Sequence, residues 1–196
     1  MANGTLKVSN IETSSGSGTI TLGQSGETVD LSNGTITGIT QGITSVTTFR
    51  LTSSLTGGSD ATISANLSAV SSPSGFGQIG SQVTQSSGIF TFPATGIWSI
   101  EAFCSFIDVG GDSSCEVATQ VTTDNSTYNN AASAIFGEAD SDNNRGVTCS
   151  KFIFDVTNTS THKCLFRQVS FASGTSLNGD SALNRTYFIF TRLGDT

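Results

Sequence analysis

The sequence has few charged residues, and few of these are basic. Lys and Arg number 8 in 196 residues, against 15 Asp and Glu, which gives a net charge of −7. A surface that binds nucleic acid needs clustered basic side chains to neutralise the phosphates. The shortage of Lys and Arg therefore argues against nucleic acid as a partner.

Long apolar runs are also absent. No stretch approaches the roughly 18 apolar residues that a membrane-spanning helix needs, so we expect no membrane insertion. The first residues, Met1 to Thr5, do not begin a basic region followed by an apolar one, which is the pattern of a secretory signal. We therefore expect the chain to be made in a cytosol.

Residue patterns that carry catalysis are missing as well. His162 is the only histidine, and no nucleophile elbow, P-loop or dinucleotide-binding glycine pattern accompanies it. No pair of carboxylates suggests acid–base work, and Glu101 falls among apolar neighbours, as a surface or interface charge does. We expect no catalytic residue, no bound cofactor and no enzymatic activity.

One acidic segment can offer oxygen ligands to a cation. It contains Glu138, Asp140 and Asp142, with Asn143 and Asn144 directly after them. Calcium prefers such ligands, but the full EF-hand pattern with its closing Glu is missing. The segment is therefore either a weak Ca²⁺ site or a solvated loop.

The four cysteines match no zinc or redox motif. They are Cys104, Cys115, Cys149 and Cys164, with spacings of 11, 34 and 15 residues. One interpretation treats them as small buried apolar residues. The other joins them in two disulfides formed in an oxidising medium.

What the sequence does contain favours β-structure. Ser, Thr, Asn and Gly are poor helix formers, whereas β-branched residues and Phe suit a pleated surface. Residues 1–45 alternate single apolar residues with Thr, Ser or Asp, repeat Gly-Thr-Ile-Thr at Gly18 and Gly34, and contain no aromatic residue. Such a segment cannot form a core alone, so we predict that residues 1–45 attach to partners or intertwine with copies of the chain.

From Phe49 onward the alternation is stronger and aromatic residues appear. Turn residues such as Gly110-Gly111-Asp112 and Asn178-Gly179-Asp180 separate the apolar stretches. About eight strands in roughly 150 residues indicate an all-β sandwich or barrel. The predicted strands are 49–55, 88–92, 97–107, 115–122, 131–137, 147–156, 162–172 and 185–193.

Three of these strands are apolar on one face and partly apolar on the other. In 97–107, Trp98 and Phe106 share one face, while Phe103 and Glu101 lie on the opposite face. A sandwich needs only one apolar face per sheet, so the second faces predict a symmetric partner. The residues expected at that interface are Phe103, Val147, Ile153, Tyr187, Ile189 and Leu193.

The stretch Gly88-Ile89-Phe90-Thr91-Phe92-Pro93-Ala94-Thr95-Gly96-Ile97-Trp98 resembles the G-x-F-x-x-P-x-x-G-x-Y stretch of C1q/TNF-like trimeric jelly rolls. The ending Tyr187-Phe188-Ile189-Phe190 is similar to the closing strand of that family. The resemblance covers residues 49–196 and implies an all-β antiparallel jelly-roll sandwich, here with an extended β-rich N-terminal segment, that forms a homotrimer. It places 97–107 beside 147–156, and 115–122 beside 162–172. The pairs Cys104–Cys149 and Cys115–Cys164 then come within reach of disulfide bonds.

Short sequence stretches within residues 1–45, such as the repeated Gly-Thr-Ile-Thr, resemble those of structural proteins in tailed bacteriophages. This resemblance implies a virion protein, assembled in the host cytoplasm, whose N-terminus binds other virion proteins. Its jelly-roll head would bind a glycan or protein of the host surface through loop residues such as Tyr128 and Asn129. Two alternatives stay open: a capsid decoration protein without a receptor role, and a soluble C1q/TNF-like binding module.

Overall fold

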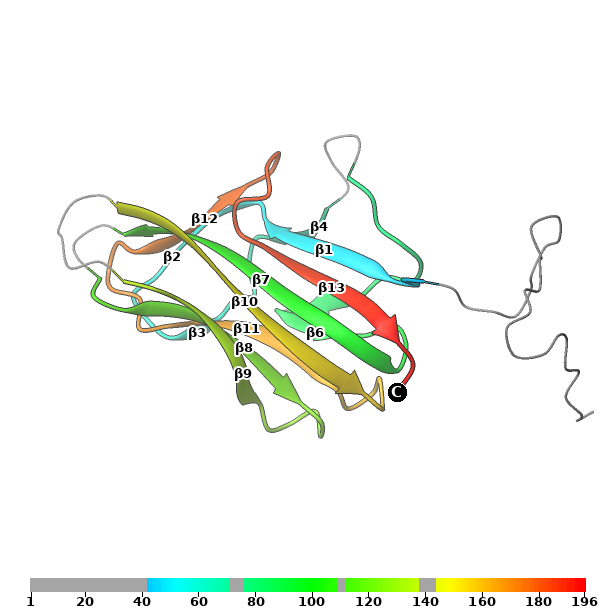
Figure 1. Cartoon of the computed structure of the whole chain (residues 1–196). Helices are drawn as coiled ribbons and strands as arrows, with labels where there is room; N and C mark the ends of the chain where they lie inside the picture. The colour runs from blue at the N-terminus through cyan, green and yellow to red at the C-terminus, as the bar shows by residue number, and fades with distance from the viewer. Residues whose placement is uncertain (1–41, 71–75, 109–111, 138–143) are drawn as a thin grey trace, which may run out of the picture. The chain divides into compact units, whose positions relative to one another are not determined.

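The computed structural model describes residues 42–70, 76–108, 112–137 and 144–196. These residues form two antiparallel sheets that pack face to face (Figure 1). Residues 1–41, which include nearly all of the predicted attachment segment, lie outside the described residues, as do Glu138, Asp140 and Asp142. The division into 1–45 and 49–196 stays a prediction, although the first strand already begins at Val46.

Sheet A has seven strands. Four long ones lie side by side in the order β10 (Asn144–Val156), β7 (Gly96–Asp108), β13 (Tyr187–Gly194) and β1 (Val46–Leu51), with β4 (Leu67–Ala69) beside β1 (Figure 1). The end of β7 pairs with β12 (Ser176–Asp180), which pairs in turn with β2 (Ser53–Thr56).

Sheet B has six strands. Its order is β5 (Thr84–Ser86), β6 (Ile89–Thr91), β11 (Lys163–Val169), β8 (Cys115–Thr122) and β9 (Asn129–Phe136), and β3 (Ala61–Thr62) also pairs with β11. All strand pairs in both sheets are antiparallel, which confirms the predicted all-β antiparallel sandwich. The predicted neighbours 97–107 with 147–156, and 115–122 with 162–172, are also confirmed.

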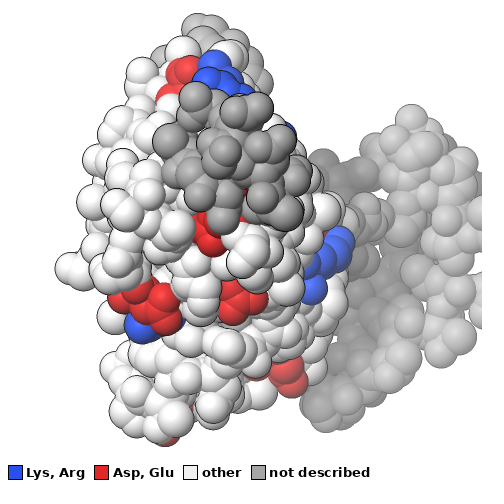
Figure 2. All heavy atoms as spheres, turned by 90° about the vertical axis from the view of Figure 1, so that its left-hand side faces the viewer, with Lys and Arg blue, Asp and Glu red and all other residues white. Residues whose placement is uncertain are grey.

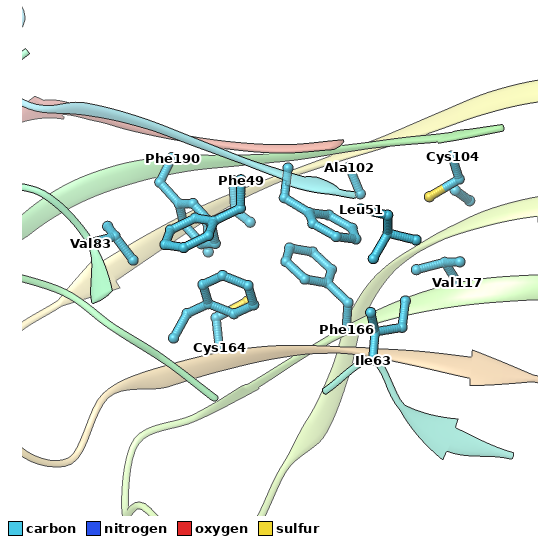
Figure 3. Close-up of a cluster of buried hydrophobic side chains, with 14 of the residues drawn as sticks. Phe49, Leu51, Ile63, Val83, Ala102, Cys104, Val117, Cys164, Phe166 and Phe190 are labelled. Atoms are coloured by element: carbon cyan, nitrogen blue, oxygen red, sulfur yellow. The ribbon is translucent and has the colours of Figure 1, made fainter. Parts of the chain in front are cut away.

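The core lies between the two sheets and is rich in phenylalanine (Figure 3). Phe90 is fully buried, and its ring lies 4.9–6.4 Å from those of Phe49, Phe166, Phe188 and Phe190. These rings come from β1, β6, β11 and β13, so the cluster joins both sheets. Tilted and edge-to-face contacts of this kind are the favoured geometries for aromatic pairs.

Two glycines of the family-like stretch are required by the backbone. Gly88 has φ of 81° and Gly96 has φ of 139°, both in the region that favours glycine. A Cβ at Gly88 would collide with the carbonyl oxygen of Ile63, and one at Gly96 would collide with that of Gly194. Glycine at these two positions allows the backbone to turn into β6 and into β7, the central strand of sheet A.

Two buried carboxylates close one end of the sandwich. Asp108 is fully buried at the end of β7, where it accepts hydrogen bonds from the backbone N–H of Asp112 (2.8 Å) and the hydroxyl of Thr175 (3.2 Å). The carboxylate of Asp112 in turn accepts a bond from the backbone N–H of Ala172 (2.8 Å). Buried acids are tolerated when their oxygens are hydrogen-bonded, and these tie the β7–β8 connection to the β11–β12 connection.

One strand prediction and one turn prediction were wrong. The predicted strand 49–55 is interrupted at Thr52, because the chain leaves β13 as its partner and pairs with β12 instead. The segment Asn178-Gly179-Asp180 was predicted to be a turn, yet it belongs to β12. Gly179 fits there because a side chain would collide with the backbone of Ser53 on β2.

Candidate self-association face

The candidate site is the face of sheet A that points away from the core, called the outer face below. It is built from alternate residues of β10, β7, β13 and β1, whose other residues fill the core. Cross-strand register arranges its central side chains in three adjacent rows. The rows are Cys149–Phe103–Tyr187, Lys151–Glu101–Ile189 and Ile153–Ser99–Thr191.

Aromatic side chains form the centre of the first row. The rings of Phe103 and Tyr187 stack with centroids 4.7 Å apart and an interplanar angle of 6°. Burial raises the pKa of Tyr187 above its ordinary value, and the nearby charges of Glu101 and Cys149 raise it further. This flat pair offers a rigid apolar surface, as interface aromatics do.

Aliphatic side chains flank the aromatic pair. Val147 is 69% exposed and Ile153 is 49% exposed, although both lie on β10 within a regular strand. Ile189 of β13 is half-buried between them and β1. Leu193 is 50% exposed and lies at the irregularity where the register between β13 and β7 shifts. An ordered apolar surface of this kind is typical of a protein–protein contact.

One ion pair interrupts the apolar surface. The ammonium of Lys151 donates to Oε1 of Glu101 at 2.8 Å, and the hydroxyl of Ser99 donates to the same oxygen at 3.1 Å. The prediction treated Glu101 only as a surface or interface charge, without a partner. Its partner depends on the register of β7 against β10, which the sequence does not reveal.

The predicted interface residues therefore meet on one surface. Phe103, Val147, Ile153, Tyr187 and Ile189 share the outer face. Leu193 lies on the same strand as the last two, at the bulge. Whether another chain covers this surface stays a prediction, because the structure contains a single chain.

The predicted disulfides are not formed. Cys104 lies opposite Thr148 and Cys149 lies opposite Phe103, so the two cysteines occupy opposite faces of sheet A. Cys164 pairs with Val121, whereas Cys115 lies at the far end of β8. The alternative interpretation as buried apolar residues holds for three of the four, since Cys149 is exposed.

The thiols of the three core cysteines are strongly desolvated. Burial raises the pKa of Cys104 and Cys164 far above the ordinary thiol value. The pKa of Cys115 rises to about 12, first through burial and then through the charges of Asp112 and Asp108. Such thiols stay protonated and unreactive at neutral pH.

The side chains of His162, for which no catalytic role was expected, and of Tyr128, which was expected to bind a sugar, both pack within the domain. His162 stacks on Phe154 with centroids 5.6 Å apart, and its ring nitrogens contact the hydroxyls of Thr157 and Thr161 at 3.1 Å. Tyr128, which was expected to present a hydroxyl to a sugar, has that hydroxyl buried, whereas Asn129 is exposed.

The described residues offer no concave or metal-binding site. Among them there is no pocket, and no group of three or more His, Cys, Asp or Glu is arranged to hold a metal ion. No helix of the described part is long and apolar enough to cross a membrane. Figure 2 shows one end of the domain, where acidic and basic residues are scattered over a mostly uncharged surface.

Comparison with solved structures defines the fold. Eiger TNF from S. frugiperda superposes with a TM-score of 0.61 over 80% of this chain and 96% of that chain, at 10% identity. Murine APRIL at pH 5.0 superposes with a TM-score of 0.57 over 76% of this chain and 98% of that chain, at 13% identity. The chain therefore has a TNF-like jelly-roll fold. No family model and no curated protein match the sequence.

Proposed function

We propose that this chain is a non-enzymatic structural and binding protein that assembles into a homotrimer through the outer face of sheet A. The observation that carries the proposal is the ordered apolar surface around the stacked Phe103 and Tyr187, with Val147 and Ile153 exposed beside it. Isolated exposed apolar residues need no explanation, but several on one regular sheet do. The TNF-like fold supports three copies as the number that covers this face.

The assembly test compares matched charge substitutions in the full chain. Ile153→Glu places a carboxylate on the outer face, and Ile135→Glu places one on β9 of sheet B, where Ile135 is 57% exposed. Sedimentation should give three times the chain mass for the wild type and for I135E, and the single-chain mass for I153E. A wild-type monomer, or an I153E variant that stays trimeric, would contradict the proposal.

We further propose that the trimer is a virion protein of a tailed phage, either a fibre or another appendage. The support is the resemblance of residues 1–45 to attachment segments of phage structural proteins. In this proposal the N-terminus binds other virion proteins, and the exposed loops of the jelly roll bind a glycan or protein on the host surface.

Two measurements test this role separately. Mass spectra of purified particles of the phage whose genome encodes the chain should contain its peptides, and their absence would contradict a virion location. The purified protein should bind host cells in a pull-down. A chain that is present in particles but does not bind cells would instead be a decoration protein. A chain that binds cells but is absent from particles would be a soluble binding module.

A further inference from the structure

The ion pair of the outer face occupies an unusual position for charged side chains. Glu101 and Lys151 form the middle one of the three central rows, between Phe103 with Tyr187 and the row of Ile153. Lys151 is 61% exposed and Glu101 26% exposed in the single chain. Water therefore reaches the pair in the single chain, and a second copy that covered the face would remove this water.

Symmetry makes an unpaired charge at such a place unfavourable. A rotation axis brings equivalent residues of different chains toward one another, so a lone carboxylate would face other carboxylates across the interface. Lys151 neutralises Glu101 within the same chain at 2.8 Å. The other charged side chains of β10 on this face, Arg145 and Asp155, lie near the two ends of the strand.

We propose that Glu101 and Lys151 act as one neutral unit that determines which surfaces can pack on the outer face. This inference rests on the proposed self-association through that face. A surface that buries the face must leave the pair intact, because separating the partners would strand a charge without water. A copy that docked in a shifted register and separated the two partners would incur this cost.

The energetics of buried ion pairs give the proposal a specific signature. Removing one partner leaves an uncompensated buried charge, whereas replacing both with apolar residues of similar volume is often neutral or stabilising. In the isolated chain water reaches the pair, which therefore contributes little to folding. The single substitutions should therefore weaken assembly more than the double substitution does, while all of these variants fold as the wild type does.

The experiment uses full-length Lys151→Met, Glu101→Leu and the double variant. The control is Arg185→Met, which removes a similarly exposed ion pair with Asp180 (3.1 Å), the last residue of β12. Circular dichroism first verifies that each variant is folded. Sedimentation over a dilution series then gives the concentration at which half of the chains are associated.

We expect each single substitution to raise that concentration by roughly 100-fold or more, and the double variant to return within about tenfold of the wild type. R185M should stay within about threefold of the wild type. If K151M associates as the wild type does, or if the double variant is as weak as the single ones, the inference is wrong although the proposed function stands. If the wild type never associates, the proposed function fails and the inference fails with it.

Discussion

Phe90 offers the sharpest test of how the two sheets are held together. Its ring is fully buried and contacts four other Phe rings that belong to β1, β11 and β13. The Phe90→Ala substitution removes these contacts and leaves a cavity that a close-packed aromatic cluster cannot easily fill.

The expected loss follows from that environment. Replacing a buried Phe with Ala costs about 3–5 kcal/mol, a range that already includes the lost ring contacts. Because Phe90 has four ring partners, we place the loss of unfolding free energy at the upper end of that range, about 4–5 kcal/mol. For a domain of this size that corresponds to a melting temperature lower by roughly 10 °C or more.

Urea and thermal unfolding measure this loss directly. Trp98 is the only tryptophan and is fully buried, so its fluorescence reports the unfolding of the core. Phe76→Ala is the control, because Phe76 is 41% exposed and its ring contacts the guanidinium of Arg50. Protein concentration is kept equal, since association would itself raise the apparent stability.

The control should lose no more than about 2 kcal/mol, because its partly exposed ring lies over the buried guanidinium of Arg50 and a desolvated cation–π contact is worth about that much. If Phe90→Ala loses less than about 2 kcal/mol, or no more than the control, the ring cluster is not the centre of the fold. The assignment of the sheet-joining role to the aromatic residues would then be wrong.

Three further predictions concern single positions. Gly88→Ala should lower the urea midpoint, since alanine there meets both an unfavourable positive φ and a carbonyl oxygen; an unchanged midpoint would contradict this. A thiol reagent should label one cysteine, Cys149, in the folded Ile153→Glu variant and label it more slowly in the trimer; equal rates would place it outside the interface. The pKa of Asp124 is depressed by hydrogen bonds to its carboxylate, so its contribution to stability should be full above about pH 4 and fall as acid protonates it. Denaturation of wild type and Asp124→Asn at several pH values measures this, and a difference that grows in acid would refute it.

The long strands could be predicted from the sequence because their residues alternate. Trp98 and Phe106 were expected on the face opposite Phe103, and both are buried in the core, whereas Phe103 and Tyr187 stack on the outer face. Alternation with period 2 is a local property that needs no knowledge of the partner strand. The same alternation in β10 placed Val147 and Ile153 on the outer face correctly.

The short strands could not be predicted in this way. β2, β3, β4, β5 and β12 have between two and five residues, which is too few to show a period. They exist because a longer strand offers hydrogen-bonding groups beside them. β12, for example, contains Asn and Gly, which favour a turn. It is nevertheless a strand because it pairs with β7 and β2.

The sequence by itself determined the class of the fold and the two faces of its long strands, because composition and alternation act along the chain. Only the tertiary structure decided which residues of neighbouring strands meet. Register places Lys151 beside Glu101, and separates Cys104 from Cys149 by the thickness of a sheet. A shift of one residue would reverse both results, since it turns every side chain of a strand to the other face.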